Sequence, residues 1–137
     1  MINPLEIKFL FFCLMGMLLI MPRFASASPI SAEIDKFTPL ETRCGWFSNP
    51  TPANAWLNDR DAEWLIGAQG GYQAVGDWPD FQPRQWVETN LHYGYGCACL
   101  RVRVNHETHE VIEIVRARPR PLSDCRNDRS LRRWGFK

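Results

Sequence analysis

The stretch Cys97-Ala98-Cys99-Leu100-Arg101-Val102-Arg103-Val104 decides the fold of this chain. Small or apolar residues alternate with polar or charged ones at a period of two, which is typical of a strand with one buried face. After a polar stretch, residues 111–115 (VIEIV) run back with similar character. The sequence therefore predicts a β-hairpin with Leu100, Val102 and Val104 on its core face.

The same alternation places Cys97 and Cys99 on the other face of the hairpin, together with Arg101 and Arg103. Two arrangements would accommodate this. A β-bulge near Ala98 would reverse the alternation and turn the cysteines inward. Otherwise the cysteines lie on the outer face of the sheet under a covering loop. The sequence leaves both arrangements open.

The first 27 residues are typical of a secretory signal peptide. Residues 9–21 form an apolar run preceded by Lys8, and Ala25-Ser26-Ala27 supplies an A-x-A cleavage site. Such a run is shorter than the roughly 20 residues that span a bilayer. We expect cleavage after Ala27 and a periplasmic or secreted product without a transmembrane segment. A flexible arm over residues 28–41 and a single domain over residues 42–137 would follow.

Four cysteines remain after cleavage, because Cys13 leaves with the signal peptide. An even number in a small exported domain indicates a disulfide framework. A bridge between Cys97 and Cys99 would close a strained loop. Two connectivities therefore stay open: 44–97 with 99–125, or 44–99 with 97–125.

Turn residues and prolines divide the rest of the domain into short segments. Proline lacks a ladder donor, so the Ser48-to-Pro52 segment is expected to end the first strand. Ser123 is the expected N-cap of a helix. We expect a mainly β fold: a small antiparallel β-sheet domain with a short C-terminal helix, stabilised by two disulfides. The further expected strands are residues 42–47, 55–57, 63–66 and 85–89, and the helix is residues 122–131.

Charge is segregated along the domain. Residues 28–100 carry four Lys or Arg against nine Asp or Glu, and residues 101–137 carry ten against five. A basic tail can bind nucleic acid or anionic lipid. It can also complement the acidic front of its own chain, and we favour this interpretation. The basic residues are not interleaved with aromatic ones, and an exported protein rarely meets nucleic acid, so none is expected as a partner.

The motifs for chemistry are sparse. Cys97-Ala98-Cys99 could bind a soft metal or exchange thiols if it were reduced. His106 and His109 are three residues apart, whereas the helical zinc motif needs four. We therefore expect no catalytic residue, no metal and no cofactor. A periplasmic metal or thiol handler, or a small enzyme using the Cys97–Cys99 segment, is the alternative.

Aromatic residues are the most suggestive candidates for a binding surface. Eight Trp and Tyr residues fall between Trp46 and Tyr95, more than a small core can easily bury. Those beside glycines and prolines are expected at the surface, where aromatic rings bind proteins or sugars. We expect an exported, non-catalytic binding protein of the bacterial envelope. Its partner would be an envelope protein, such as a hydrolase that it inhibits, or a cell-wall glycan. The candidate binding residues are Tyr72, Trp78, Phe81, Tyr93 and Tyr95.

Several motifs together resemble a bacterial family of small exported proteins catalogued as a domain of unknown function. The resemblance covers roughly residues 42–131 and implies a periplasmic or secreted protein of Gram-negative type. It implies no activity, substrate or catalytic residue. The motifs are R-C-G-W-F from Arg43, Q-G-G-Y-Q-A from Gln69, Y-G-Y-G-C-A-C from Tyr93 and C-R-x-D from Cys125.

Overall fold

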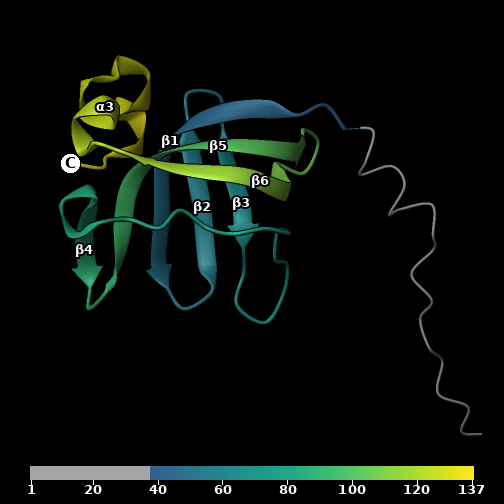
Figure 1. The fold of residues 1–137 in the computed structure, drawn as a ribbon, viewed down its shortest axis with the longest axis horizontal. Helices are drawn as coiled ribbons and strands as arrows, with labels where there is room; N and C mark the ends of the chain where they lie inside the picture. The colour runs from purple at the N-terminus through teal and green to yellow at the C-terminus, as the bar shows by residue number, and fades with distance from the viewer. Residues whose placement is uncertain (1–37) are drawn as a thin grey trace, which may run out of the picture.

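The computed structural model describes residues 38–137, so the expected signal peptide and most of the expected N-terminal arm lie outside the described residues. The domain is mainly β, with a short helical segment at its C-terminal end (Figure 1). The strands are β1 (Glu41–Thr51), β2 (Asn54–Asp59), β3 (Glu63–Gly67), β4 (Trp86–Asn90), β5 (Tyr93–Asn105) and β6 (Glu110–Arg120). The helices are η1 (Pro83–Gln85), α3 (Leu122–Asn127) and η2 (Arg129–Trp134).

The six strands form one sheet that closes into a barrel. Its order is β1-β2-β3-β6-β5-β4, and β1 also pairs with β5. Strands β1, β2, β3, β6 and β5 form the closed ring, and β4 pairs with β5 outside it. The expected fold class is confirmed. The sheet is mixed, however, because β3 and β6 pair in parallel at Leu65 and Glu110.

The seam between β3 and β6 is completed by the loop that follows β3. The Val75 N–H donates to the Ile112 carbonyl at 3.0 Å, and the Ile114 N–H donates to the Val75 carbonyl at 2.7 Å. On the other side, the Ala74 N–H donates to the Ile66 carbonyl at 2.8 Å. Ala74 and Val75 therefore fill the gap where β3 and β6 separate, because Ala74 hydrogen-bonds to β3 and Val75 hydrogen-bonds to β6.

The barrel interior holds the main core. Leu100, Val102 and Val104 point into it, as the alternation predicted, together with Leu57 and Ile66. Burying such side chains supplies roughly 1.5–3 kcal/mol each. The two arms of the predicted hairpin are confirmed as β5 and β6.

The prediction that the first strand ends at Ser48 is wrong, because β1 continues to Thr51. The register of the β1–β2 pair shifts between Ser48 and Thr51, which places Pro50 in an irregular stretch of the ladder. On the β5 side the ladder already ends at Asn49. A proline is tolerated there because no ladder bond needs its missing N–H.

The predicted C-terminal helix is divided in two and is not capped by Ser123. Helix α3 follows Pro121 and ends at Asn127, and the 3₁₀ helix η2 begins after Asp128. The Asp128 carboxylate accepts hydrogen bonds from the Ser130 N–H at 2.9 Å and from the Ser130 hydroxyl at 2.6 Å. These bonds lower the pKa of Asp128. This second cap explains why one helix does not continue through the segment.

Candidate functional site

The cysteines lie on the outer face of the barrel, and the alternation of β5 is not reversed near Ala98. Cys97 bonds to Cys125 and Cys99 bonds to Cys44, which selects one of the two expected connectivities. Cys97 is buried beneath α3 and η2, in a cluster with Trp46 and Leu131. The outer-face alternative is therefore the observed one, but the cover consists of helices and lies over Cys97 only. Cys44 is exposed, and Cys99 lines an open cleft. Neither sulfur of the Cys97–Cys99 segment is a free thiol.

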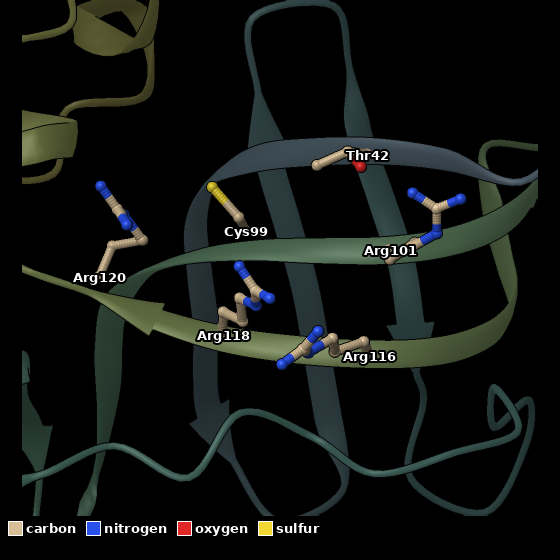
Figure 2. A pocket seen from close by; sticks show the side chains of 6 residues that line it. All are labelled: Thr42, Cys99, Arg101, Arg116, Arg118 and Arg120. Atoms are coloured by element: carbon tan, nitrogen blue, oxygen red, sulfur yellow. The ribbon is translucent and has the colours of Figure 1, made fainter.

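Beyond this cover, the outer face of β1, β5 and β6 stays open and forms a cleft of about 320 Å³. We call it the arginine cleft. The Cys44–Cys99 disulfide joins two of its strands, β1 and β5. Figure 2 shows the six side chains that line the cleft. All four of its arginines are exposed. The residues lining the cleft are Thr42, Cys99, Arg101, Arg116, Arg118 and Arg120.

Strand register decides which residues share the cleft. Arg101 of β5 lies directly opposite Arg116 of β6, and on its other side it faces Thr42 of β1. Arg118 lies opposite Cys99. In Figure 2 the guanidinium groups are spread along the two strands and do not meet at one point.

Most of this positive charge is not neutralised. Arg120 pairs with Asp124 of α3, with an Nη2–Oδ2 distance of 2.8 Å. Arg101, Arg116 and Arg118 have no ion-pair partner among residues 38–137. Like charges directly opposite each other on paired strands are destabilising. The Arg101–Arg116 pair therefore carries a repulsion that a bound anion would relieve.

Among residues 38–137, no arginine of the basic tail forms an ion pair with an Asp or Glu side chain of the acidic front. Arg103 pairs with Glu113 at 3.0 Å, and Arg120 pairs with Asp124, so both partners belong to the tail itself. Arg133 reaches the front only through the backbone carbonyl of Asp59, at 3.4 Å. The internal complementarity that we favoured from the sequence therefore leaves the arginine cleft uncompensated.

The aromatic candidates are distributed over several places. Trp78 and Phe81 come together over Phe47, with ring centroids 5.7 and 5.8 Å from it, at one end of the barrel core. The Tyr72 hydroxyl donates to the Val111 carbonyl at 2.8 Å. The Tyr93 ring packs against the His92 ring at a tilt of 39°, with 4.1 Å between the ring centroids.

Tyr95 lies apart from the other candidates, on the outer face of β5. Its ring packs against Trp46 and Phe136, and its hydroxyl donates to the Lys137 carbonyl at 2.8 Å. It lines a mainly apolar groove of about 380 Å³ that the sequence did not single out. The other residues of this groove are Ser48, Pro50, Trp56, Glu63, Thr89, Gly94 and Phe136.

A buried ion pair closes the end of the barrel near β1 and β2. The Arg43 Nη1 atom lies 2.6 Å from the Asp59 carboxylate, and its guanidinium stacks 3.9 Å above the Trp64 ring. Burial lowers the pKa of Arg43, but hydrogen bonds and charge from Asp59 and Glu41 outweigh it and hold that pKa above its ordinary value. Arg43 therefore serves the structure of the barrel end.

His106 and His109 do not assemble a metal site in the described structure. Their rings contact the edge of Trp64, and His106 Nε2 lies 3.2 Å from Glu41. Within residues 38–137, no three His, Cys, Asp or Glu side chains group closely enough to hold a metal ion.

Sequence reasoning missed the arginine cleft, although a signal for it was present. Arginine recurs at every second position in residues 116–120, and Arg101 and Arg103 repeat that spacing in the partner strand. A period of two puts such residues on one face of a strand. The pattern can thus be detected locally, but the register that makes it a cleft cannot.

Comparison with known proteins identifies the family to which this chain belongs. Among residues 38–137 there is no helix with the length and hydrophobicity needed to cross a membrane. No curated protein and no solved structure matches the chain. A family described as a protein of unknown function (DUF4087) matches residues 38–132, which include all six strands, α3 and both disulfides. The chain therefore belongs to the DUF4087 family of proteins of unknown function.

Proposed function

We propose that this protein is an exported, non-catalytic binding module of the bacterial envelope that holds an acidic ligand in its arginine cleft. The observation that carries the proposal is the facing pair Arg101 and Arg116, with Arg118 beside it and no counter-charge in the described part of the chain. Arginine forks bind carboxylate and phosphate oxygens with strong, charge-assisted hydrogen bonds. An acidic ligand gains these bonds and removes the repulsion between the two strands.

The composition of the cleft supports binding without catalysis. An arginine guanidinium does not deprotonate in proteins, so it cannot act as a general base. The Cys99 sulfur is held in a disulfide, and Thr42 contributes only a hydroxyl group. The cleft therefore presents charge and hydrogen-bond donors, but no pair of groups suited to moving a proton.

Two features support export. The first is the signal-peptide pattern that ends at Ala27. The second is the pair of disulfides, which persist in oxidising compartments such as the periplasm. An envelope protein with an acidic surface and an acidic cell-wall glycan are the two ligand classes that fit this location.

The binding proposal is tested by polyanion chromatography of the protein from Ser28 onward. We expect retention on both sulfated-glycan and poly-glutamate columns, with elution at raised salt. The triple variant R101A/R116A/R118A should elute much earlier, with a melting temperature no lower than that of the native protein, because the variant also removes the repulsion between Arg101 and Arg116. Arg84→Ala serves as the matched control, because Arg84 is an exposed arginine of η1 that does not line the cleft. Equal retention of the triple variant and the native protein would contradict the proposal.

Export is tested separately by cell fractionation and the intact mass of the recovered protein. We expect periplasmic or released protein that begins at Ser28 and has no alkylatable thiol. Cytoplasmic protein with Met1 retained would contradict this part of the proposal.

A further inference from the structure

Strand geometry converts the arginine pattern into a row of fixed spacing. Arg116, Arg118 and Arg120 occupy alternate positions of β6, and all three are exposed. Residues two apart in a strand are separated by about 6.7 Å, so the row extends over about 13 Å. Arg101 widens the row at one end, where it faces Arg116. The positive charge is thus arranged along a line.

The residues that line the cleft beside the arginine row carry no aromatic rings. Thr42 of β1 and Cys99 of β5 line the cleft beside the row, and in the described structure no Trp, Tyr or Phe lines this cleft. Proteins that bind single-stranded nucleic acid combine a basic groove with aromatic rings on which bases stack. The missing rings disfavour such a ligand. A compact anion is also a poor match, because it would need donors that meet at one point.

We infer that the ligand of the arginine cleft is a linear anionic glycan polymer that lies along β6, with successive acidic groups on successive arginines. This inference rests on the proposed function and names its ligand. Carboxylates of a polyuronate chain and phosphates of a phosphodiester-linked envelope polymer present the same chemistry to an arginine fork. The uncharged part of each repeating unit, a sugar ring or a glycerol, needs no stacking platform, and the length of the unit spaces the acidic groups along the row.

The Arg120–Asp124 ion pair sets the length of the row available to the polymer. Asp124 accepts from Arg120 Nε at 2.9 Å and lies 2.8 Å from Nη2, so it competes with any ligand for that guanidinium. Removing the Asp124 charge frees the third arginine of the row. The variant Asp124→Asn should therefore bind the polymer more tightly, which is an increase that a purely structural role of these arginines would not produce.

Arginines on β6 also have an alternative structural role. Beyond Ile114, β6 has only β5 as a partner strand among residues 38–137. Charged side chains on an exposed strand edge oppose aggregation, and lysine serves this purpose as well as arginine. A ligand-binding fork is lost when lysine replaces arginine. The variant Arg118→Lys therefore separates the two roles.

The experiment is calorimetric titration of the protein from Ser28 onward with defined probes. The probes are oligogalacturonates of two to six units, short poly(glycerol phosphate) chains, neutral maltohexaose, and inorganic phosphate. We expect affinity to rise with chain length and to level off once the row is covered. Maltohexaose and inorganic phosphate should not bind measurably. The better of the two anionic series identifies the source of the acidic groups.

Single-residue variants test which side chains bind the polymer. Loss of one charge-assisted fork in Arg116→Ala or Arg118→Ala should weaken binding about tenfold. We expect Arg118→Lys to weaken binding several-fold without aggregation, Asp124→Asn to strengthen it, and Arg84→Ala to leave it unchanged. Arg116→Ala and Arg118→Ala, which each lose a positive charge, should also show a shallower dependence of affinity on salt, by about one unit of slope.

Three outcomes would overturn the inference. Tight binding of inorganic phosphate, with no effect of chain length, would make the cleft a compact-anion site. Binding of poly-glutamate but of neither anionic polymer series would assign an acidic protein surface, and the proposed function would stand. Binding of no anionic probe, with no difference between the native protein and R101A/R116A/R118A, would remove both the inference and the proposed function.

Discussion

Single residues decide the stability of the barrel end. The role of Asp59 there can be tested directly by substitution. Its carboxylate pairs with Arg43 and accepts the N–H groups of Asp61 and Ala62 at 2.7 and 2.8 Å. Both Arg43 and Asp59 are buried, with exposed fractions of 8% and 2%. Removing Asp59 takes away the buried partner of Arg43, which then keeps only the more exposed Glu41 and Asp61. It also removes the acceptor of two backbone N–H groups.

We therefore predict that Asp59→Ala lowers the free energy of unfolding by about 3–5 kcal/mol. The matched control is Asp61→Ala. Asp61 also contacts Arg43, at 3.2 Å, but its side chain is largely exposed, so its loss should cost less than about 1 kcal/mol. Urea denaturation of both variants measures the difference. Similar losses from the two substitutions would show that Arg43 does not depend on a buried partner.

Gly96 is a second residue whose identity is imposed by packing. A Cβ atom at this position would lie 2.5 Å from the Phe81 ring and 2.7 Å from the Gln85 carbonyl oxygen. Phe81 packs against Phe47 of the core, and Gln85 belongs to η1, which follows Phe81 in the chain. Glycine is therefore needed here for close approach and not for an unusual backbone angle.

Gly96→Ala is predicted to destabilise the domain by about 1–3 kcal/mol, as overpacking typically does. Gly71→Ala is the control, because its nearest neighbour would lie at 3.7 Å. The double variant Gly96→Ala/Phe81→Ala should lose less than the sum of the two single variants, since removing the ring makes room for the methyl group. Chemical denaturation of the native protein, the two single variants Gly96→Ala and Phe81→Ala, and the double variant tests this. Strict additivity of the two losses would contradict the packing argument.

At the scale of elements, the C-terminal helices form a separate layer fixed to the outer face of the barrel. The Cys97–Cys125 disulfide, the buried Leu131 and a 2.7 Å hydrogen bond from the Trp134 indole N–H to the Asp59 carbonyl hold it there. Helices of six residues would not be stable by themselves. Their order therefore depends on these attachments.

We predict that Cys97→Ala/Cys125→Ala loses about 3.5 kcal/mol, the chain-entropy value for the loop that this bridge closes. The larger effect should be local: trypsin should cut rapidly within residues 126–133 while the barrel remains folded. Cys44→Ala/Cys99→Ala is the contrasting variant, because its bridge joins two strands of the barrel and does not anchor the helices. Unchanged protease resistance of the Cys97/Cys125 variant would show that Leu131 and Trp134 suffice.

For the whole molecule, closure of the barrel depends on its shortest seam. Strands β1 and β5 pair over nine residues, whereas β3 and β6 share a single bridge and rely on Ala74 and Val75. Opening at this seam would turn the ring into an open sheet with two unpaired edges.

Val75→Pro is predicted to weaken the seam, because proline cannot donate to the Ile112 carbonyl and the lost bond costs about 1–3 kcal/mol. Hydrogen exchange should accelerate first at the amides of Leu65, Ala74 and Ile114, and only later along the β1–β5 pair. Val75→Ala retains the N–H group and should keep the native exchange pattern. Uniform acceleration in the proline variant would instead indicate that the barrel opens as one unit.

The chain itself determined the elements that depend on local pattern. The alternation around Cys99 predicted the central hairpin and its buried face, and the cysteine count predicted two disulfides. Turn residues separated the two expected strands at residues 55–57 and 63–66, which are β2 and β3 in the structure. These features follow from neighbouring residues, because a period of two and the preference of Asp, Asn and Gly for turns are properties of a short segment.

Only the tertiary structure decided which residues meet. Strand β6 carries two extra residues relative to β5, between Val111 and Glu113 and between Ile114 and Arg116. They shift the register so that Arg116 lies opposite Arg101, whereas an unbulged hairpin would set it opposite Cys99. The choice of Cys44 as the partner of Cys99, and the dispersal of the aromatic candidates, likewise follow from pairing between distant segments. Register and closure minimise the free energy of the whole barrel, so no local stretch of sequence encodes them.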